Sequence, residues 1–195
     1  MTTRLWILKF GGREFTKEGY LQPVRYRFEN KSYYIGTKHG YDLILYAQVN
    51  LSAVKQIERI DVRTFDHDIQ VMKSRLFLED CEKVSEWRSD RQLKSDYFEY
   101  FQGRGSRDSA PDGAYLSLGG KTIAFEYEIA QKSKKRYQDK VYRYVSCIRQ
   151  TGNYVGPRYD HVRIVCEKEA VFKILTNLIK EQYLCFSVLK EFNLF

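Results

Sequence analysis

The sequence has few of the features that are typical of zinc-cluster, low-complexity or membrane proteins. It has four Cys and no CxxC pair, so a zinc cluster is not expected. Three Pro and twelve Gly in 195 residues argue against a low-complexity chain. No apolar run approaches the ~20 residues that span a bilayer. The sequence also lacks GxSxG, HExxH, GxxxxGK[ST] and GxGxxG, which leaves the common hydrolase, zinc-protease and nucleotide-binding classes without support.

The cysteines are widely spaced, and the chain starts without a signal-peptide pattern. We therefore expect reduced, buried thiols and a cytoplasmic protein that does not enter a membrane. The four cysteines are Cys81, Cys147, Cys166 and Cys185.

The charge is distributed unevenly along the chain. Lys and Arg number 33 against 25 Asp and Glu, which gives +8 and a pI near 9.2. Residues 1–60 carry ten basic and five acidic side chains (+5), residues 61–130 ten and fourteen (−4), and residues 131–195 thirteen and six (+7). This pattern suits a protein that gathers carboxylates centrally and grips a polyanion around them. Simple variation of charge along a solvated surface explains it equally well.

Residues 1–60 are predicted to form a β-rich N-terminal segment. Leu5–Phe10 is an apolar run, Val24–Phe28 alternates, Tyr33–Ile35 is a short strand, and Thr37 begins a helix that continues through Ala47. The segment is either the wing of a winged-helix remnant or an ordinary small sheet.

Residues 61–195 are predicted to form one α/β (α+β) domain with the succession α-β-β-β-α-β-α-β. A helix begins at Asp66, with apolar positions Ile69, Met72, Leu76 and Phe77. The later elements are strands Val84–Trp87, Ala114–Leu118 and Thr122–Ala130, a helix from Ser133 to Gln150, strand His161–Cys166, helix Glu169–Lys180 and strand Leu184–Leu189. A polar stretch follows the first strand to about Gly105, and Gly119-Gly120 is a hairpin turn.

The third predicted strand carries two neighbouring carboxylates. Alternation places Glu126 and Glu128 on one face, between Ala124 and Ala130. At ~4 Å and an effective dielectric constant of ~20, two such charges repel by about 4 kcal/mol. Exposure to water, a shared proton or a bound cation must relieve that repulsion. Asp112 begins the partner strand and can reach the same patch, so the three form a candidate Mg²⁺ or Mn²⁺ site. The alternative is a solvated pair of surface glutamates.

A strongly basic segment follows the carboxylates. Residues 131–150 contain seven basic side chains and one acid, Asp139. We expect Arg136, Lys140 and Arg143 to line the side of the helix opposite its apolar stripe, as a phosphate-binding surface next to the metal. A solvated basic face is the alternative. The candidate DNA contacts are Lys132, Lys134, Lys135, Arg136, Lys140 and Arg143.

Several short segments of the sequence resemble those of known protein families. Asp112 followed by Glu126-Tyr127-Glu128 resembles the PD-(D/E)xK nuclease superfamily, with Glu128 at the position of the usual motif lysine. Over about residues 33–150, local strings resemble the replication-relaxation, or MobC-type plasmid mobilisation, family of relaxases. They are His67-Asp68, Glu86 to Asp90 (EWRSD), Pro111-Asp112, Ile123 to Tyr137 (IAFEYEIAQKSKKRY) and Tyr34 to Gly40 (YIGTKHG).

The resemblance implies a restriction-endonuclease-like αβββαβ core, with a mixed central sheet flanked by helices. It implies a metal-dependent DNA endonuclease or nickase of relaxase type, which acts at the transfer origin of a plasmid or conjugative element with other relaxosome proteins. Asp112 and Glu126 would hold the metal, with the Tyr127 carbonyl as a further ligand. Glu128 would ligate metal or act as a general base, and Asp68 would add a carboxylate.

The resemblance also suggests that Lys132 or Lys134 replaces the missing motif lysine and stabilises charge on the scissile phosphate. The nucleophile would be water or a tyrosine hydroxyl. His67 either belongs to this catalytic site or has a helix-capping or packing role. A non-catalytic DNA-binding accessory or regulator with the same fold is the competing hypothesis, favoured by the missing lysine.

Overall fold

A computed structural model describes residues 16–25, 32–39, 64–102, 110–149, 156–179 and 185–190. The chain divides into two compact units, Met1–Met72 and Lys73–Phe195. This boundary lies inside helix α3 (Phe65–Cys81), about twelve residues later than the predicted domain boundary near residue 60. Within the described ranges, no helix combines the length and apolar character that crossing a membrane requires.

The first unit contains a two-stranded antiparallel sheet. Strands β1 (Leu21–Arg25) and β2 (Ser32–Gly36) pair with Leu21 opposite Gly36. The Thr37 hydroxyl donates to the Gly19 carbonyl at 2.5 Å and closes the open end of this hairpin.

The predicted strands in this unit differ in accuracy. Tyr33–Ile35 lies inside β2, as predicted, but β1 begins three residues earlier than the predicted strand at Val24 and includes Pro23. The Leu5–Phe10 run and most of the helix predicted from Thr37 to Ala47 lie outside the described residues.

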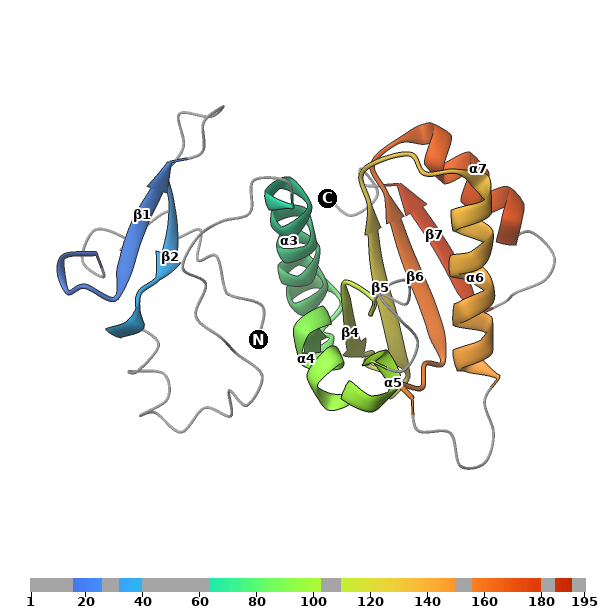
Figure 1. The fold of residues 1–195 in the computed structure, drawn as a ribbon, viewed down its shortest axis with the longest axis horizontal. Coiled ribbons are helices and arrows are strands. Elements are labelled where there is room, and N and C mark those ends of the chain that lie inside the picture. Colours follow the sequence, from blue (N-terminus) through green and yellow to red (C-terminus); the bar gives the residue numbers. More distant parts are fainter. Residues whose placement is uncertain are drawn as a thin grey trace. The chain divides into compact units, whose positions relative to one another are not determined.

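The second unit has a five-stranded mixed sheet in the order β3-β4-β5-β6-β7. Strand β4 is antiparallel to β3 and β5, whereas β5, β6 and β7 are parallel (Figure 1). The elements after α3 are β3 (Ser85–Ser89), α4 (Asp90–Asp96), α5 (Phe98–Gln102), β4 (Gly113–Leu116), β5 (Thr122–Glu128), α6 (Lys134–Ile148), β6 (His161–Cys166), α7 (Glu169–Ile179) and β7 (Phe186–Lys190).

The predicted succession of helices and strands is therefore confirmed, with two additions. Helices α4 and α5 occupy the stretch that is predicted to be a polar connection. Ser89 explains the start of α4, because its side chain caps the helix by accepting from the Gln92 N–H at 3.4 Å.

The apolar stripe predicted for α3 is wrong at one position. Leu76 is 56% exposed, whereas Leu78 is fully buried. Ser74 is also buried, and with Val71 and Leu78 it follows helical spacing. A small polar residue on the inner face hides this stripe in the sequence.

The hairpin between β4 and β5 forms at the predicted glycines. The Gly120 N–H donates to the Ser117 carbonyl at 2.9 Å, and the Ser117 N–H donates to the Lys121 carbonyl at 2.9 Å. Gly120 has φ +73, a conformation that an L side chain rarely adopts.

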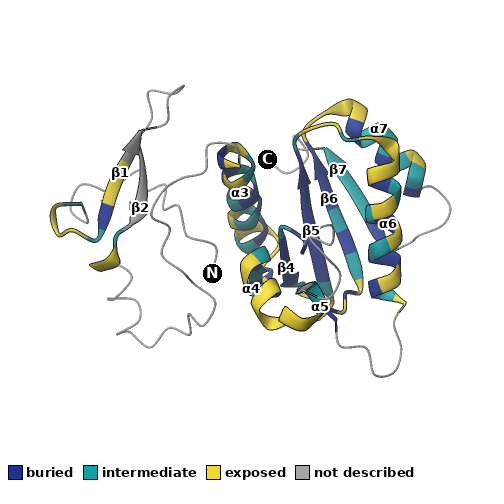
Figure 2. Ribbon diagram, viewed as in Figure 1, coloured by how far each residue is buried: buried dark blue, intermediate teal, exposed yellow. Residues whose placement is uncertain are grey.

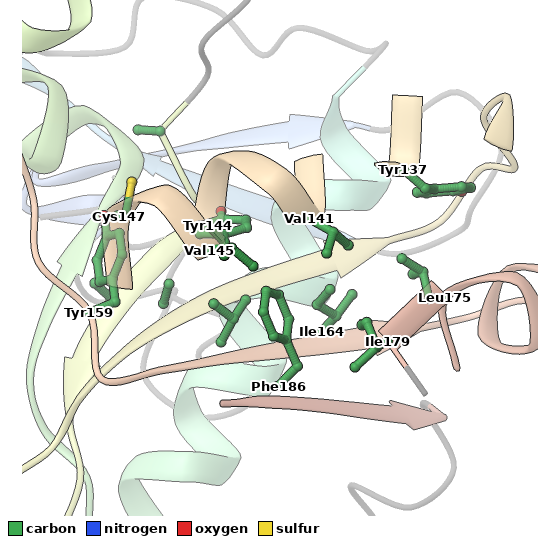
Figure 3. Close-up of a cluster of buried hydrophobic side chains, with 14 of the residues drawn as sticks. Tyr137, Val141, Tyr144, Val145, Cys147, Tyr159, Ile164, Leu175, Ile179 and Phe186 are labelled. Atoms are coloured by element: carbon green, nitrogen blue, oxygen red, sulfur yellow. The ribbon is translucent and has the colours of Figure 1, made fainter. Parts of the chain in front are cut away.

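The central strand β5 is covered on both faces, and its residues from Ile123 to Glu128 are all buried (Figure 2). On one face Ala124 contributes to a core under α6, where Val141 and Tyr144 point toward Ile164 of β6 (Figure 3). On the other face Phe125 contacts the Trp87 ring at a centroid distance of 5.4 Å. An internal strand is what the sequence predicts for this segment.

Gly113 is required by the packing of Trp87. A Cβ atom at Gly113 would lie 2.4 Å from Trp87 Cζ2, well inside van der Waals contact. The indole also stacks on Tyr115 with a centroid distance of 5.7 Å, so it has little freedom to move away. The glycine therefore lets Trp87 lie flat against the start of β4, immediately after Asp112.

We predict that Gly113→Ala lowers the free energy of unfolding by about 1–3 kcal/mol, because the added methyl displaces Trp87. Gly119→Ala is the matched control, since nothing lies within 4 Å of its added Cβ. It should change stability by less than about 0.5 kcal/mol. Urea unfolding followed by Trp fluorescence measures both, and equal effects would contradict this account of Gly113.

Candidate functional site

The two glutamates of β5 are buried inside the second unit. Glu126 is 4% exposed and Glu128 is 1% exposed, so the alternative of a solvated surface pair is wrong. Both lie on one face of the strand, as the sequence predicts, and in the structure this face is directed toward α6. Buried carboxylates need partners, because an uncompensated charge in the interior costs several kcal/mol.

Lys140 supplies the main partner. Its Nζ lies 2.7 Å from Glu126 Oε2 and 2.5 Å from Glu128 Oε1, and its side chain is only 11% exposed. Lys140 is three residues after Tyr137 and four before Tyr144, and both tyrosines are buried. It therefore lies on the inner stripe of α6. The prediction that Lys140 lies on the outer face, opposite the apolar stripe, is therefore wrong.

Two further donors complete the coordination of the glutamates. The Tyr144 hydroxyl donates to Glu126 Oε1. Lys132 Nζ donates to Glu128 Oε2 at 2.8 Å, and its side chain is 35% exposed. Each of the four glutamate oxygens thus accepts a hydrogen bond. We use the name carboxylate–lysine cluster for the two glutamates with Lys132, Lys140, Tyr144 and Asp112.

The loop between β5 and α6 is held so that Lys132 reaches Glu128. The Tyr137 hydroxyl donates to the Ala130 carbonyl at 3.2 Å and accepts from the Lys132 N–H at 3.0 Å. Ser133 then caps α6 by accepting from the Arg136 N–H at 3.4 Å, as the sequence predicts.

Asp112 lies at the same end of β5. Its Oδ2 accepts from the Tyr127 N–H at 2.7 Å, and Tyr127 stands between the two glutamates in sequence. The β4–β5 ladder ends at the pair Gly113 and Phe125, and the Asp112 side chain continues the pairing by accepting from β5 beyond that point. The predicted approach of Asp112 to the glutamate pair is therefore present, and Asp112 is only partly buried.

The electrostatics of the cluster favour cations. Burial lowers the pKa of Lys140, but the carboxylates of Glu126, Glu128 and Asp112 together outweigh burial and leave this pKa above that of free lysine. Lys140 is therefore an ammonium at neutral pH. Three carboxylates against two ammonium groups give the cluster a formal charge of −1.

Neighbouring groups stay protonated. Burial, and then the charge of Glu126, raises the pKa of Tyr144 well above its usual range, so Tyr144 remains a hydroxyl donor. Burial, and then Glu128, raises the pKa of Cys166 to about 12, so its thiol does not add a negative charge at neutral pH.

The other predicted site residues have the following local contacts and exposures. Asp68 Oδ2 accepts from the Thr64 hydroxyl at 3.2 Å, and Asp68 Oδ1 lies 3.5 Å from His67 Nδ1. Both contacts are at the N-terminal end of α3. The Arg143 guanidinium lies 5.7 Å from the centroid of the Tyr144 ring and is half-buried. The exposed basic side chains of the first turn of α6 are Lys134, Lys135 and Arg136.

The carboxylates of the cluster are donors of the kind that divalent metals prefer, but they are not arranged as a metal site. Among the described residues, no group of three or more His, Cys, Asp and Glu side chains is arranged to hold a metal ion. However, Glu126 and Glu128 already hold a cation between them, the Lys140 ammonium, and Asp112 acts on the same charge. Carboxylate oxygens are the ligands that Mg²⁺ and Mn²⁺ prefer.

The residues that sequence reasoning misses here are Lys140 and Tyr144. Lys140 is predicted to lie opposite the apolar stripe of its helix, and no contact of Tyr144 with the glutamates is predicted. The available signal is the helical spacing from Tyr137, which places Lys140 on the inner stripe.

Comparisons with known proteins identify no relative. Neither the scan against protein-family models nor the searches of curated proteins and solved structures gave a match.

We predict that Tyr144→Phe destabilises the protein by about 1–3 kcal/mol, because Glu126 Oε1 is then left without its donor inside the core. Tyr142→Phe removes a hydroxyl from an exposed position of the same helix and should change stability by less than about 0.5 kcal/mol. Chemical denaturation compares the two variants. If they behave alike, the Tyr144–Glu126 hydrogen bond does not stabilise the cluster.

Proposed function

We propose that the protein is a metal-dependent DNA endonuclease or nickase of relaxase type, which cleaves a phosphodiester at a plasmid or conjugative-element origin. One observation carries the proposal: the Lys140 ammonium lies between Glu126 and Glu128, and the Asp112 carboxylate acts electrostatically on the same ammonium. The succession α3-β3-β4-β5-α6-β6 supports it, because it matches the αβββαβ core that the resemblance implies, with α4 and α5 as insertions.

Lys140 is our candidate for the lysine that the motif lacks. The motif position itself is Glu128, but a lysine from the following helix brings an ammonium to the same carboxylates. Lys132 provides a second ammonium at the more exposed end of the cluster. Lys134 is exposed in the first turn of α6 and is therefore assigned to DNA contact instead.

Asp112 and Glu126 are the residues that would hold Mg²⁺ or Mn²⁺, with the Tyr127 carbonyl as a further oxygen ligand. When bound, such an ion polarises a phosphate and lowers the pKa of a bound water. The cluster opens to solvent at its Asp112 and Lys132 end, where side chains are partly exposed, whereas the buried Tyr144 closes the other end. The scissile phosphate would approach from the open end.

Each remaining residue of the cluster has a role that its contacts define. Tyr144 orients Glu126, and Glu128 holds the two ammonium groups in place. Lys140 and Lys132 would stabilise negative charge on the phosphate. Tyr144 is a poor nucleophile, because its pKa is raised by burial and then by Glu126. Water is therefore the nucleophile that we favour.

The first turn of α6 would contact the DNA backbone. Lys134, Lys135 and Arg136 are all exposed and directly follow the loop that carries Lys132. The positive end of the helix dipole adds to their charge. A phosphate bound there lies on the same helix as Lys140, which connects the DNA contact to the cluster.

A specific observation favours a second candidate, a non-catalytic DNA-binding accessory or regulator with the same fold. All four glutamate oxygens are already bound by the protein's own donors, so the cluster can serve as a structural ion-pair network. In that case DNA binding would persist without any metal-dependent cleavage.

A plasmid-nicking assay separates the two candidates. With Mg²⁺ or Mn²⁺ and supercoiled DNA that carries the presumed origin, the wild type should give open circles that EDTA prevents. Asp112→Asn and Glu126→Gln should lower the nicking rate by roughly 100-fold or more. Asp139→Asn removes an exposed carboxylate of α6 and should nick normally. Nicking that is unchanged in Asp112→Asn and Glu126→Gln would refute the site.

The DNA contact is tested by salt dependence. We predict that Lys134→Ala with Arg136→Ala weakens DNA binding and reduces the slope of log K against log salt by about 2, or roughly 0.9 for each phosphate that is no longer neutralised. Fluorescence anisotropy with a labelled duplex, over a range of salt concentrations, measures the slope. An unaltered slope would remove this turn of α6 from the interface.

A further inference from the structure

The position of Lys140 has a consequence for how the cluster takes up a cation. Glu126 Oε1 is held by Tyr144, so Glu126 is fixed with its Oε2 toward Lys140. Glu128 is fixed in the same way, with Oε2 on Lys132 and Oε1 on Lys140. The two inner oxygens, one from each glutamate, thus converge on a single ammonium group.

We propose that the Lys140 ammonium is a built-in counter-ion at the position where the cluster binds Mg²⁺ or Mn²⁺, so that Lys140 and the metal compete for Glu126 and Glu128. The inference rests on the proposed function, because it concerns the same metal site. It assigns Lys140 two states: paired with the glutamates in the metal-free protein, and directed toward the open end of the cluster when a metal is held.

The charges and burial of the cluster support this competition. With Lys140 in place the cluster has a formal charge of −1, and without its ammonium the charge would be −2, with two glutamates buried and underpaired. A site of charge −2 attracts a divalent cation more strongly than a site of charge −1. The ammonium therefore stabilises the metal-free fold and at the same time weakens metal binding.

The decisive variant is Lys140→Met, which keeps the apolar stem of the side chain and removes its charge. Without metal, its unfolding temperature should fall by about 10 °C or more, because the glutamates lose their shared cation. It should also bind Mn²⁺ at least roughly tenfold more tightly than the wild type. Mn²⁺ should then raise its unfolding temperature by more than that of the wild type.

Lys94→Met is the matched control. It removes the same charge from an exposed i,i+4 pair with Asp90, in which the Lys94 side chain is 47% exposed. Its unfolding temperature and Mn²⁺ affinity should equal those of the wild type. Mn²⁺ affinity is measured by electron paramagnetic resonance of the free ion, and stability by thermal unfolding of the full chain with and without Mn²⁺.

If Lys140→Met does not fold without metal, Lys140→Gln keeps a neutral donor near the glutamates, and the same gain in Mn²⁺ affinity is expected. A folded variant that binds Mn²⁺ no more tightly than the wild type overturns the competition, while the proposed function survives if the wild type still binds Mn²⁺ and nicks DNA. Failure of both wild type and variants to bind Mn²⁺ overturns the metal-dependent function as well.

Discussion

The ion pair between Lys140 and the two glutamates of β5 is the constraint on which the second unit depends. Two carboxylates on the central strand of a sheet that is covered on both faces require a cation inside the structure. Helix α6 provides it while packing Val141 and Tyr144 onto the same face. The hydrophobic contact and the ion pair therefore fix the same interface, and each supports the other.

A second constraint positions Asp112. Trp87 of β3 lies against Gly113 and fixes the start of β4. Asp112 directly precedes Gly113, and its side chain accepts a hydrogen bond from the Tyr127 N–H of β5. The Asp112 carboxylate thereby lies at the open end of the cluster, just beyond the point where the pairing of β4 with β5 ends. Packing on the far face of the sheet thus determines where the charge lies on the near face.

These contacts show where the basic side chains of α6, which contribute to the overall charge of +8, lie in the structure. Helix α6 has basic residues both on its inner stripe and in an exposed set. Its inner stripe carries one lysine that neutralises buried acids, and its first turn presents Lys134, Lys135 and Arg136 to solvent. Only the exposed set adds to the basic surface of the protein, so the number of basic residues in a segment overstates the basic surface that it presents to solvent.

The sequence by itself determined the order of the elements in the second unit, the Gly119-Gly120 hairpin, the Ser133 cap and the shared face of Glu126 and Glu128. These follow from local periodicity and turn chemistry, which act over a few residues. It also indicated Asp112 as a neighbour, because a hairpin makes the pairing of its two strands predictable. It carried no clear signal for α4 and α5, or for the inner face of α3, where Ser74 interrupts the apolar pattern.

Only the tertiary structure decided what the glutamates bind. Whether a lysine on a helix faces solvent or a strand depends on how that helix is rotated against the sheet, and packing of the whole apolar stripe sets this rotation. The contacts of Lys140 and Tyr144 with Glu126 join residues 14 and 18 positions apart across two elements. Helical spacing can place Lys140 on the stripe of Tyr137, but it does not say which strand that stripe packs against. The sequence alone therefore places these residues in a segment but not in a site.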